Sequence, residues 1–163
     1  MATKKKVGIK VPTKNEILKK YGSMIIQASD TKEPGLWLPS TFFNLNYTLG
    51  GGFPWGKVTE IAGEESSGKT LIALNAAYAC QQLGGSVIWV DAEQSWMNSW
   101  AELNGIDPNK VTVIRDTRIE YISDAVADVA IYLRSQLVNN EPILLVVDSV
   151  AAIDCSDNID SKT

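Results

Sequence analysis

The 163-residue sequence contains no histidine and only two cysteines, Cys80 and Cys155, which lie far apart in the chain. It therefore offers neither a disulfide framework nor a His/Cys metal site, and a reducing intracellular compartment is the default expectation. No apolar run approaches the roughly 20 residues of a membrane-spanning helix. The basic amino terminus lacks the apolar stretch and cleavage site of a secretory signal. These absences predict a soluble, cytoplasmic protein.

Charge is unevenly distributed along the chain. The net charge is -4, yet residues 1–32 carry eight lysines against Glu16 and Asp30, so this segment is +6 and the remainder is -10. A basic arm on an acidic body predicts electrostatic docking. The alternative for residues 1–13 is a solvated, disordered tail.

The first 56 residues give weak signals for secondary structure. We expect a short amphipathic helix over 15–21, and the apolar segment 24–27 suits a strand or a helix end. Glycine and proline predict a turn over 30–35 and an irregular stretch over 50–56. We therefore divide the chain into an amino-terminal arm, residues 1–41, and a core, residues 42–163.

From Lys57 onward, short apolar runs alternate with helical patterns. The predicted strands cover residues 58–61, 87–90, 111–114 and 143–147, and the predicted helices cover 69–83, 95–104 and 119–138. This alternation is typical of an α/β fold, in which helices cover both faces of a parallel sheet.

The segment from Gly63 to Thr70 matches the phosphate-binding pattern G-x-x-x-x-G-K-[ST] in full, between a predicted strand and a predicted helix. Loop amides and the helix dipole would hold a triphosphate there, with Lys69 on the β- and γ-phosphates and the Thr70 hydroxyl on magnesium. The alternative is a structural glycine-rich turn. The residues expected to contact ATP here are Gly63, Glu64, Glu65, Ser66, Ser67, Gly68, Lys69, Thr70 and Leu71.

Acidic residues follow two of the predicted strands. Asp148, with Ser149 beside it, ends the run ILLVVDS, where it can face the loop and hold magnesium. Asp91 and Glu93 follow the run VIWV, and we expect Glu93 to be the base that orients and deprotonates the attacking water. The alternative for each acid is a helix cap or a solvated strand end.

Three segments, LGGGFPWGKVTEIAGEESSGKT, VIWVDAE and LLVVDSVAA, together resemble the RecA recombinases, with the motifs in the same order and at similar separations. The resemblance runs from about Tyr21 to about Ala152. It implies a P-loop ATPase core of a DNA-dependent ATPase, with the phosphate cradle at 63–70, the catalytic glutamate at Glu93 and the magnesium-side aspartate at Asp148.

The sequence departs from the family pattern at several positions. Trp100 stands where the family places a tyrosine against adenine, and either base stacking or a core position suits it. Met97 replaces the aspartate that assists adenine recognition. Glu64 replaces a proline and Leu71 a threonine, and neither change removes a phosphate contact.

The resemblance also implies partners. The family's amino-terminal helix and strand pack onto the next subunit to build a filament on single-stranded DNA, so we expect residues 14–41 to mediate homo-oligomerisation, in a bacterial cell or a phage-infected host. The family's DNA-binding loops and later strands have no counterpart here, so we expect a core truncated at its carboxyl end. The alternatives are a non-hydrolysing ATP-dependent assembly module, half of a split recombinase completed by a partner, and, more distantly, a hexameric helicase core.

Overall fold

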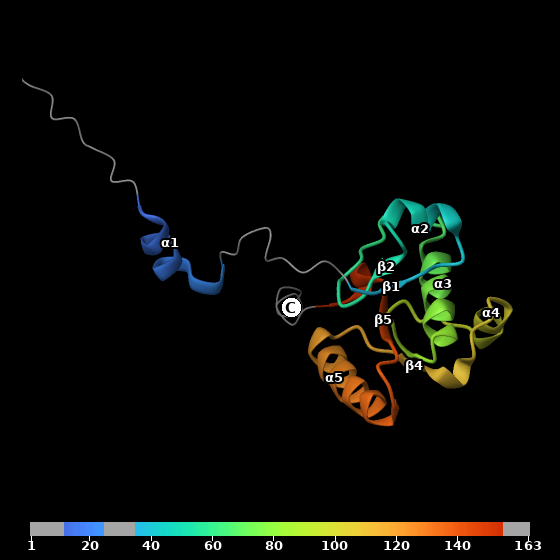
Figure 1. The fold of residues 1–163 in the computed structure, drawn as a ribbon. Helices are drawn as coiled ribbons and strands as arrows, with labels where there is room; N and C mark the ends of the chain where they lie inside the picture. The colour runs from blue at the N-terminus through green and yellow to red at the C-terminus, as the bar shows by residue number, and fades with distance from the viewer. Residues whose placement is uncertain (1–11, 25–34, 155–163) are drawn as a thin grey trace, which may run out of the picture. The chain divides into compact units, whose positions relative to one another are not determined.

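The computed structural model describes residues 12–24 and 35–154 (Figure 1), and the chain divides into two compact units, Met1–Gly35 and Leu36–Thr163. The first unit contains helix α1 (Lys14–Tyr21), followed by a 3-10 turn, η1 (Gly22–Met24). A capping box begins α1: the Glu16 amide donates to the Thr13 hydroxyl, and the Thr13 amide donates to the Glu16 carboxylate at 2.8 Å. The predicted helix over 15–21 is confirmed.

Other predictions for the arm fall largely outside the described residues. These are residues 25–27 of the apolar segment, the predicted turn up to residue 34, and the lysines at 4, 5, 6, 10 and 32. The strand expected in the arm and the division between residues 41 and 42 therefore stay predictions.

The second unit is built around a three-stranded parallel sheet in the order β4-β3-β5. The strands are β3 (Ser86–Asp91), β4 (Val111–Ile114) and β5 (Ile143–Asp148). In the central strand, Val87 pairs with Val111 on one side and Leu144 on the other. Residues 87–91 are all buried, as expected for a strand covered on both faces. These three strands confirm the sequence prediction.

Two long helices cover the sheet, α3 (Lys69–Gln82) and α5 (Ile119–Gln136). Val87 and Trp89 of β3 belong to the core cluster that includes the apolar residues of α3, whereas Ile88, between them, lines a surface groove with residues of α5. Because successive strand residues point to opposite faces, the helices lie on opposite sides of the sheet, as Figure 1 shows. The predicted α/β arrangement is confirmed, and no helix among the described residues is long and apolar enough to cross a membrane.

A small antiparallel pair precedes the sheet, and the sequence did not predict it. Strand β1 (Trp37–Leu38) pairs with β2 (Phe53–Pro54), and helix α2 (Phe43–Leu49) connects them. The approach of the two strands depends on Gly52, since a Cβ there would overlap the Leu38 carbonyl. Leu38 is buried in the core cluster, so this pair packs onto the main sheet's α3 side.

The predicted strand over 58–61 is wrong. These residues form no helix or strand, and Val58 is 97% exposed. In the described part of the chain they pair with neither β4 nor β5. A short run of this kind forms a strand only where a neighbouring strand satisfies its backbone groups, and among the described strands none pairs with this segment.

The predicted helix over 95–104 begins later than expected. Helix α4 spans Asn98–Leu103, because the amides of Ser95 and Trp96 donate to the Asp91 carboxylate and hold the preceding residues in a loop. Two 3-10 turns complete the unit, η3 (Pro108–Lys110) before β4 and η4 (Val150–Ala152) after β5.

Candidate functional site

The loop from Gly63 to Thr70 closes on itself at the start of α3. The Lys69 ammonium donates to the carbonyl oxygens of Gly63 at 3.1 Å and Glu64 at 2.7 Å. Gly68 precedes the helix with φ +92°, a left-handed conformation that favours glycine. Gly68, the second glycine of the predicted motif, therefore adopts a backbone conformation that other residues rarely adopt.

The start of α3 is suited to an anion. The helix has 14 residues and no acidic residue in its first turn. The amides of the first turn have no partner within the helix, and the helix dipole adds positive potential at this end. Lys69 is the first residue of the helix, so its ammonium charge lies at the same end. Leu71, one residue further along than Thr70, is 40% exposed.

One hydrogen bond joins the loop to the sheet. The Thr70 hydroxyl donates to Asp148 Oδ2 at 2.9 Å, across 78 positions of sequence. Asp148 is the last residue of β5, and its register partner in β3 is Asp91. The start of α3 and the carboxyl ends of the parallel strands thus meet, where ligands bind in open α/β sheets.

Glu93 lies at the same edge of the sheet. Its Oε1 accepts a hydrogen bond from the Ser149 hydroxyl at 2.6 Å. Ser149 directly follows Asp148. The hydrogen bond from Ser149 therefore holds Glu93 close to Asp148, the other acid predicted to act in the site. The structure thus brings Lys69, Thr70, Glu93, Asp148 and Ser149 to one edge of the sheet.

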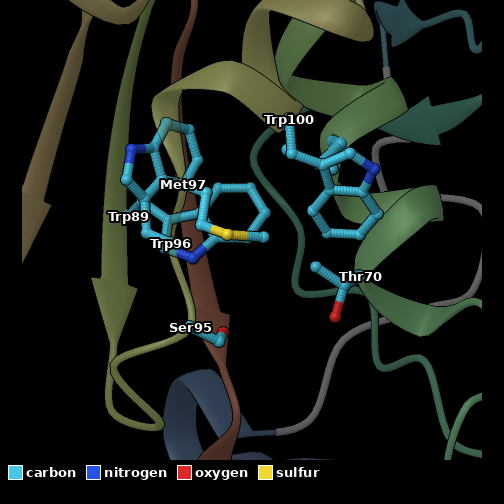
Figure 2. Close-up of a pocket in the computed structure, with 7 residues that line it drawn as sticks. Thr70, Trp89, Ser95, Trp96, Met97 and Trp100 are labelled. Carbon is cyan, nitrogen blue, oxygen red and sulfur yellow. The ribbon is translucent and has the colours of Figure 1, made fainter.

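An apolar pocket lies beside Thr70, and Trp100 forms one of its walls (Figure 2). Trp89 and Trp96 pack together in another wall, with ring centroids 5.0 Å apart. Trp100 is 38% exposed and Met97 58%, so neither is a buried core residue. The pocket is lined by Thr70, Leu74, Trp89, Ser95, Trp96, Met97 and Trp100.

Asp91 has a different position from Glu93. It is fully buried and accepts hydrogen bonds from the amides of Ser95 at 2.8 Å and Trp96 at 3.1 Å. Its ion pair with Arg115 was not predicted: a cation follows the predicted strand 111–114, but no local pattern places that strand beside β3. Asp91 therefore closes the loop before α4. It neither caps that helix, whose N-cap Met97 makes no side-chain hydrogen bond, nor lies at a solvated strand end.

Arg118, three residues after Arg115, forms a second ion pair, with Asp116. The Arg118 guanidinium donates to Asp116 at 2.6 Å and 2.9 Å, and these hydrogen bonds hold the pKa of Asp116 well below its usual range. Arg118 also lies over the Tyr121 ring, 4.0 Å from its centroid. These contacts fix the start of α5 and do not involve the loop that carries Glu93.

A model of the RecA N-terminal domain matches residues 10–163, nearly the whole chain. The chain belongs to the RecA family. It is 37% identical over 148 residues to Protein RecA of Malacoplasma penetrans (strain HF-2), covering 90% of this chain and 43% of that protein. It is 32% identical over 157 residues to Protein RecA of Bacteroides thetaiotaomicron, covering 94% of this chain and 45% of that protein.

A third relative, Protein RecA of Petrotoga mobilis (strain DSM 10674 / SJ95), is 40% identical over 117 residues, covering 71% of this chain and 30% of that protein. This RecA-family chain thus spans less than half the length of these relatives and corresponds to the family's amino-terminal portion. The resemblance inferred from its motifs is confirmed.

Proposed function

We propose that this RecA-family chain is the ATP-binding and ATP-hydrolysing part of a DNA recombinase that acts in homologous recombination and repair. The observation that supports this best is the 2.9 Å hydrogen bond between Thr70 and Asp148. It joins the start of α3, where an anion is favoured, to the sheet edge that carries the acidic residues. Phosphoryl transfer needs these two kinds of group side by side.

The loop at residues 63–70 would bind the triphosphate. Its amides and those of the first turn of α3 are donors at the positive end of the helix dipole. Lys69 now donates to two carbonyl oxygens of its own loop, at 2.7 and 3.1 Å. A phosphate oxygen would compete for this ammonium with a full negative charge, so the exchange favours the nucleotide.

Thr70 and Asp148 suit magnesium. In the described residues no three acidic or cysteine side chains gather into a closed metal site. Magnesium in phosphoryl-transfer sites needs only one or two protein oxygen ligands, with waters and phosphates completing its shell, and this pair supplies them. When bound, the ion would neutralise charge that develops on the phosphate oxygens.

Glu93 would act as the general base. Its carboxylate would orient a water toward the γ-phosphorus and accept the proton as the new P–O bond forms and the bond to the leaving ADP oxygen breaks. The Ser149 hydroxyl donates to Oε1 of Glu93, which fixes the carboxylate and leaves Oε2 for the water. Trp100 would stack on the base, while Met97 offers it only a weak thioether acceptor.

The activity of the whole protein is the wider part of the proposal. Relatives named Protein RecA and the matching family model support a cytoplasmic protein that assembles with itself into filaments on single-stranded DNA. The isolated 163 residues would bind Mg-ATP and hydrolyse it slowly, without stimulation by single-stranded DNA. Several-fold stimulation of the isolated chain would contradict this last statement.

Phosphate release tests the role of Glu93. We expect Glu93→Gln to lower the rate about 100-fold or more, because a positioned general base contributes about 10²- to 10⁴-fold. Nucleotide affinity should stay within about twofold, because the phosphate contacts are made by other residues. Glu102→Gln, which removes an exposed carboxylate from α4, is the control and should match the wild type. Equal rates for Glu93→Gln and the wild type would favour a non-hydrolysing assembly module instead.

A further inference from the structure

A buried carboxylate lies beneath the loop that carries Glu93. Asp91 is 0% exposed, and its two oxygens accept hydrogen bonds from the amides of Ser95 and Trp96 at 2.8 and 3.1 Å. Glu93 lies between Asp91 and these two amides in sequence. The carboxylate of Asp91 therefore closes a short loop, residues 92–96, with Glu93 inside it.

The same loop is held at its other end by the backbone. The Ala92 amide donates to the Asp148 carbonyl at 3.2 Å, and the Gln94 amide donates to the Asp91 carbonyl at 3.2 Å. Gln94 has φ +55°, an unfavourable conformation for a residue with a side chain. The contacts of the loop, including the side-chain contacts of Asp91, offset the cost of this conformation.

Arg115 supplies the charge that this arrangement needs. Its Nε lies 3.2 Å from Asp91 Oδ2, and its Nη2 donates to the Trp96 carbonyl at 3.2 Å. Arg115 directly follows β4, and its side chain is 53% exposed whereas that of Asp91 is 0% exposed. A buried carboxylate is costly unless it is paired, and the ion pair with Arg115 offsets the cost of burying Asp91.

The guanidinium also joins two parts of the loop. One nitrogen contacts the side chain beneath the loop, and another contacts the backbone at Trp96. Only the planar fork of arginine offers several donors in fixed directions; a lysine ammonium at the same place carries the charge without this geometry. The contact thus depends on the shape of the side chain as well as on its charge.

We propose that Arg115 is a positioning residue: through Asp91 and the Trp96 carbonyl, it holds the 92–96 loop so that the Glu93 carboxylate stays at Ser149. The positioning stands on the contacts of the loop alone. Its consequence for catalysis rests on the proposed function, since Glu93 must act as the base for hydrolysis to depend on Arg115.

Two measurements on the full chain test this proposal separately. The first is amide hydrogen exchange at Ser95 and Trp96, which needs no enzymatic activity. Arg115→Ala should speed exchange at both amides about tenfold, in keeping with the loss of a charge-assisted hydrogen bond. Arg115→Lys should give a smaller increase. Exchange at the amides of α3 should not change.

The second measurement is the steady-state rate of phosphate release with Mg-ATP. Arg115→Ala should lower kcat about 10- to 100-fold, since a catalytic group displaced by about 1 Å loses a factor of this order, while KM stays within about twofold. Arg115→Lys should recover part of the loss. A residue that only stabilised the fold would instead lower the melting temperature and leave kcat of the folded protein unchanged.

Arg118→Ala is the matched control. Arg118 also follows β4, is 50% exposed in its side chain and forms an ion pair, but with Asp116 and not with the 92–96 loop. It should leave exchange at Ser95 and Trp96, and kcat, at wild-type values.

The outcomes separate the two proposals. Unchanged exchange at Ser95 and Trp96 in Arg115→Ala overturns the positioning role, whatever the hydrolysis rate. If that variant does not fold, Arg115→Lys is measured instead, and unchanged exchange together with unchanged kcat in Arg115→Lys overturns the positioning role. If the wild type hydrolyses ATP, faster exchange in Arg115→Ala with an unchanged kcat also overturns the proposal that Arg115 positions Glu93. A wild type that binds ATP but does not hydrolyse it contradicts the proposed function alone, and the exchange rates then decide the role of Arg115.

Discussion

At the scale of single residues, two side-chain hydrogen bonds connect segments that are far apart in the sequence. Thr70 contacts Asp148 at 2.9 Å, and Ser149 contacts Glu93 at 2.6 Å. The bonds end on adjacent residues of the chain, so a small displacement at the end of β5 would alter both. This explains why the proposed magnesium ligand and the proposed base belong to one geometric unit.

Cys80 gives a residue-scale prediction about pH. The thiol is fully buried in α3, and burial raises its pKa from the ordinary value of 9.0 to about 11. Because the folded pKa is higher than the unfolded one, the stability from this group is fully present below pH 9 and is lost as pH rises toward 11. In a Cys155→Ser background, the free energy of unfolding in urea should fall over this range.

The control for this prediction is the Cys80→Ala variant in the same background. Tyrosine and lysine titrations are common to both proteins, so only the difference between their pH profiles reports Cys80. The difference in the free energy of unfolding between the two proteins should narrow between pH 9 and 11. Parallel profiles over this range would show that the thiol does not titrate differently in the folded state.

At the scale of secondary structure, the approach of α3 to the first residues of β3 depends on Gly85. Its amide donates to the Cys80 carbonyl at 3.0 Å, and the next amide, of Ser86, donates to the Pro142 carbonyl at 3.1 Å. A Cβ at Gly85 would overlap the Pro142 carbonyl and lie 2.7 Å from Cys80 Sγ. There is no room for a methyl group where the helix, β3 and β5 meet.

Gly85→Ala should therefore destabilise the fold by about 1–3 kcal/mol, the usual cost of overpacking. Thermal or urea unfolding of the purified chain measures this. Gly35→Ala serves as the control, because a Cβ there meets no atom within 4 Å. Equal stability of the two variants would mean that the sheet shifts easily to accept the methyl group.

Most elements of the core could be predicted from local sequence. The helix after the phosphate-binding pattern, the strands at 87–90, 111–114 and 143–147, and the helix from residue 119 all have strong local signals, and the structure has them. The segment 58–61 is also a short run with apolar residues at both ends, but it has no neighbouring strand, and pairing is not visible in a local pattern.

The site was partly predictable for the same reason. Lys69, Thr70, Glu93 and Asp148 could be identified because a motif and strand ends mark them. The contact of Arg115 with Asp91 could not, because it depends on β4 lying beside β3, which is a property of sheet order. The later start of α4 has the same origin, since the Asp91 carboxylate binds the amides that would have begun the helix.

At the scale of the whole molecule, the chain divides into the units Met1–Gly35 and Leu36–Thr163, and the basic segment 1–32 lies within the first. Deleting residues 1–35 removes α1 and the lysines while keeping the β1–β2 pair, which begins at Trp37. If the arm mediates self-assembly, this deletion should reduce the oligomer mass measured by light scattering. Raising the salt concentration should also reduce the oligomer mass, since salt screens attraction between the basic arm and an acidic core.

Deleting only residues 1–11 is the control for the arm. It removes the lysines at 4, 5, 6 and 10 and keeps α1, so it separates the effect of tail charge from that of the helix. An unchanged oligomer mass after deletion of residues 1–35 would contradict a role for the arm in assembly.

The central claim is that the start of α3 binds the triphosphate of ATP, and calorimetric titration of the chain with ATP and magnesium tests it most directly. Lys69→Ala should raise the Kd about 10- to 100-fold, because a hydrogen bond to a charged group contributes about 1.5–3 kcal/mol. Lys110→Ala, at the amino end of β4, should bind like the wild type. The absence of binding heat for the wild type, or equal affinities for Lys69→Ala and wild type, would contradict the account.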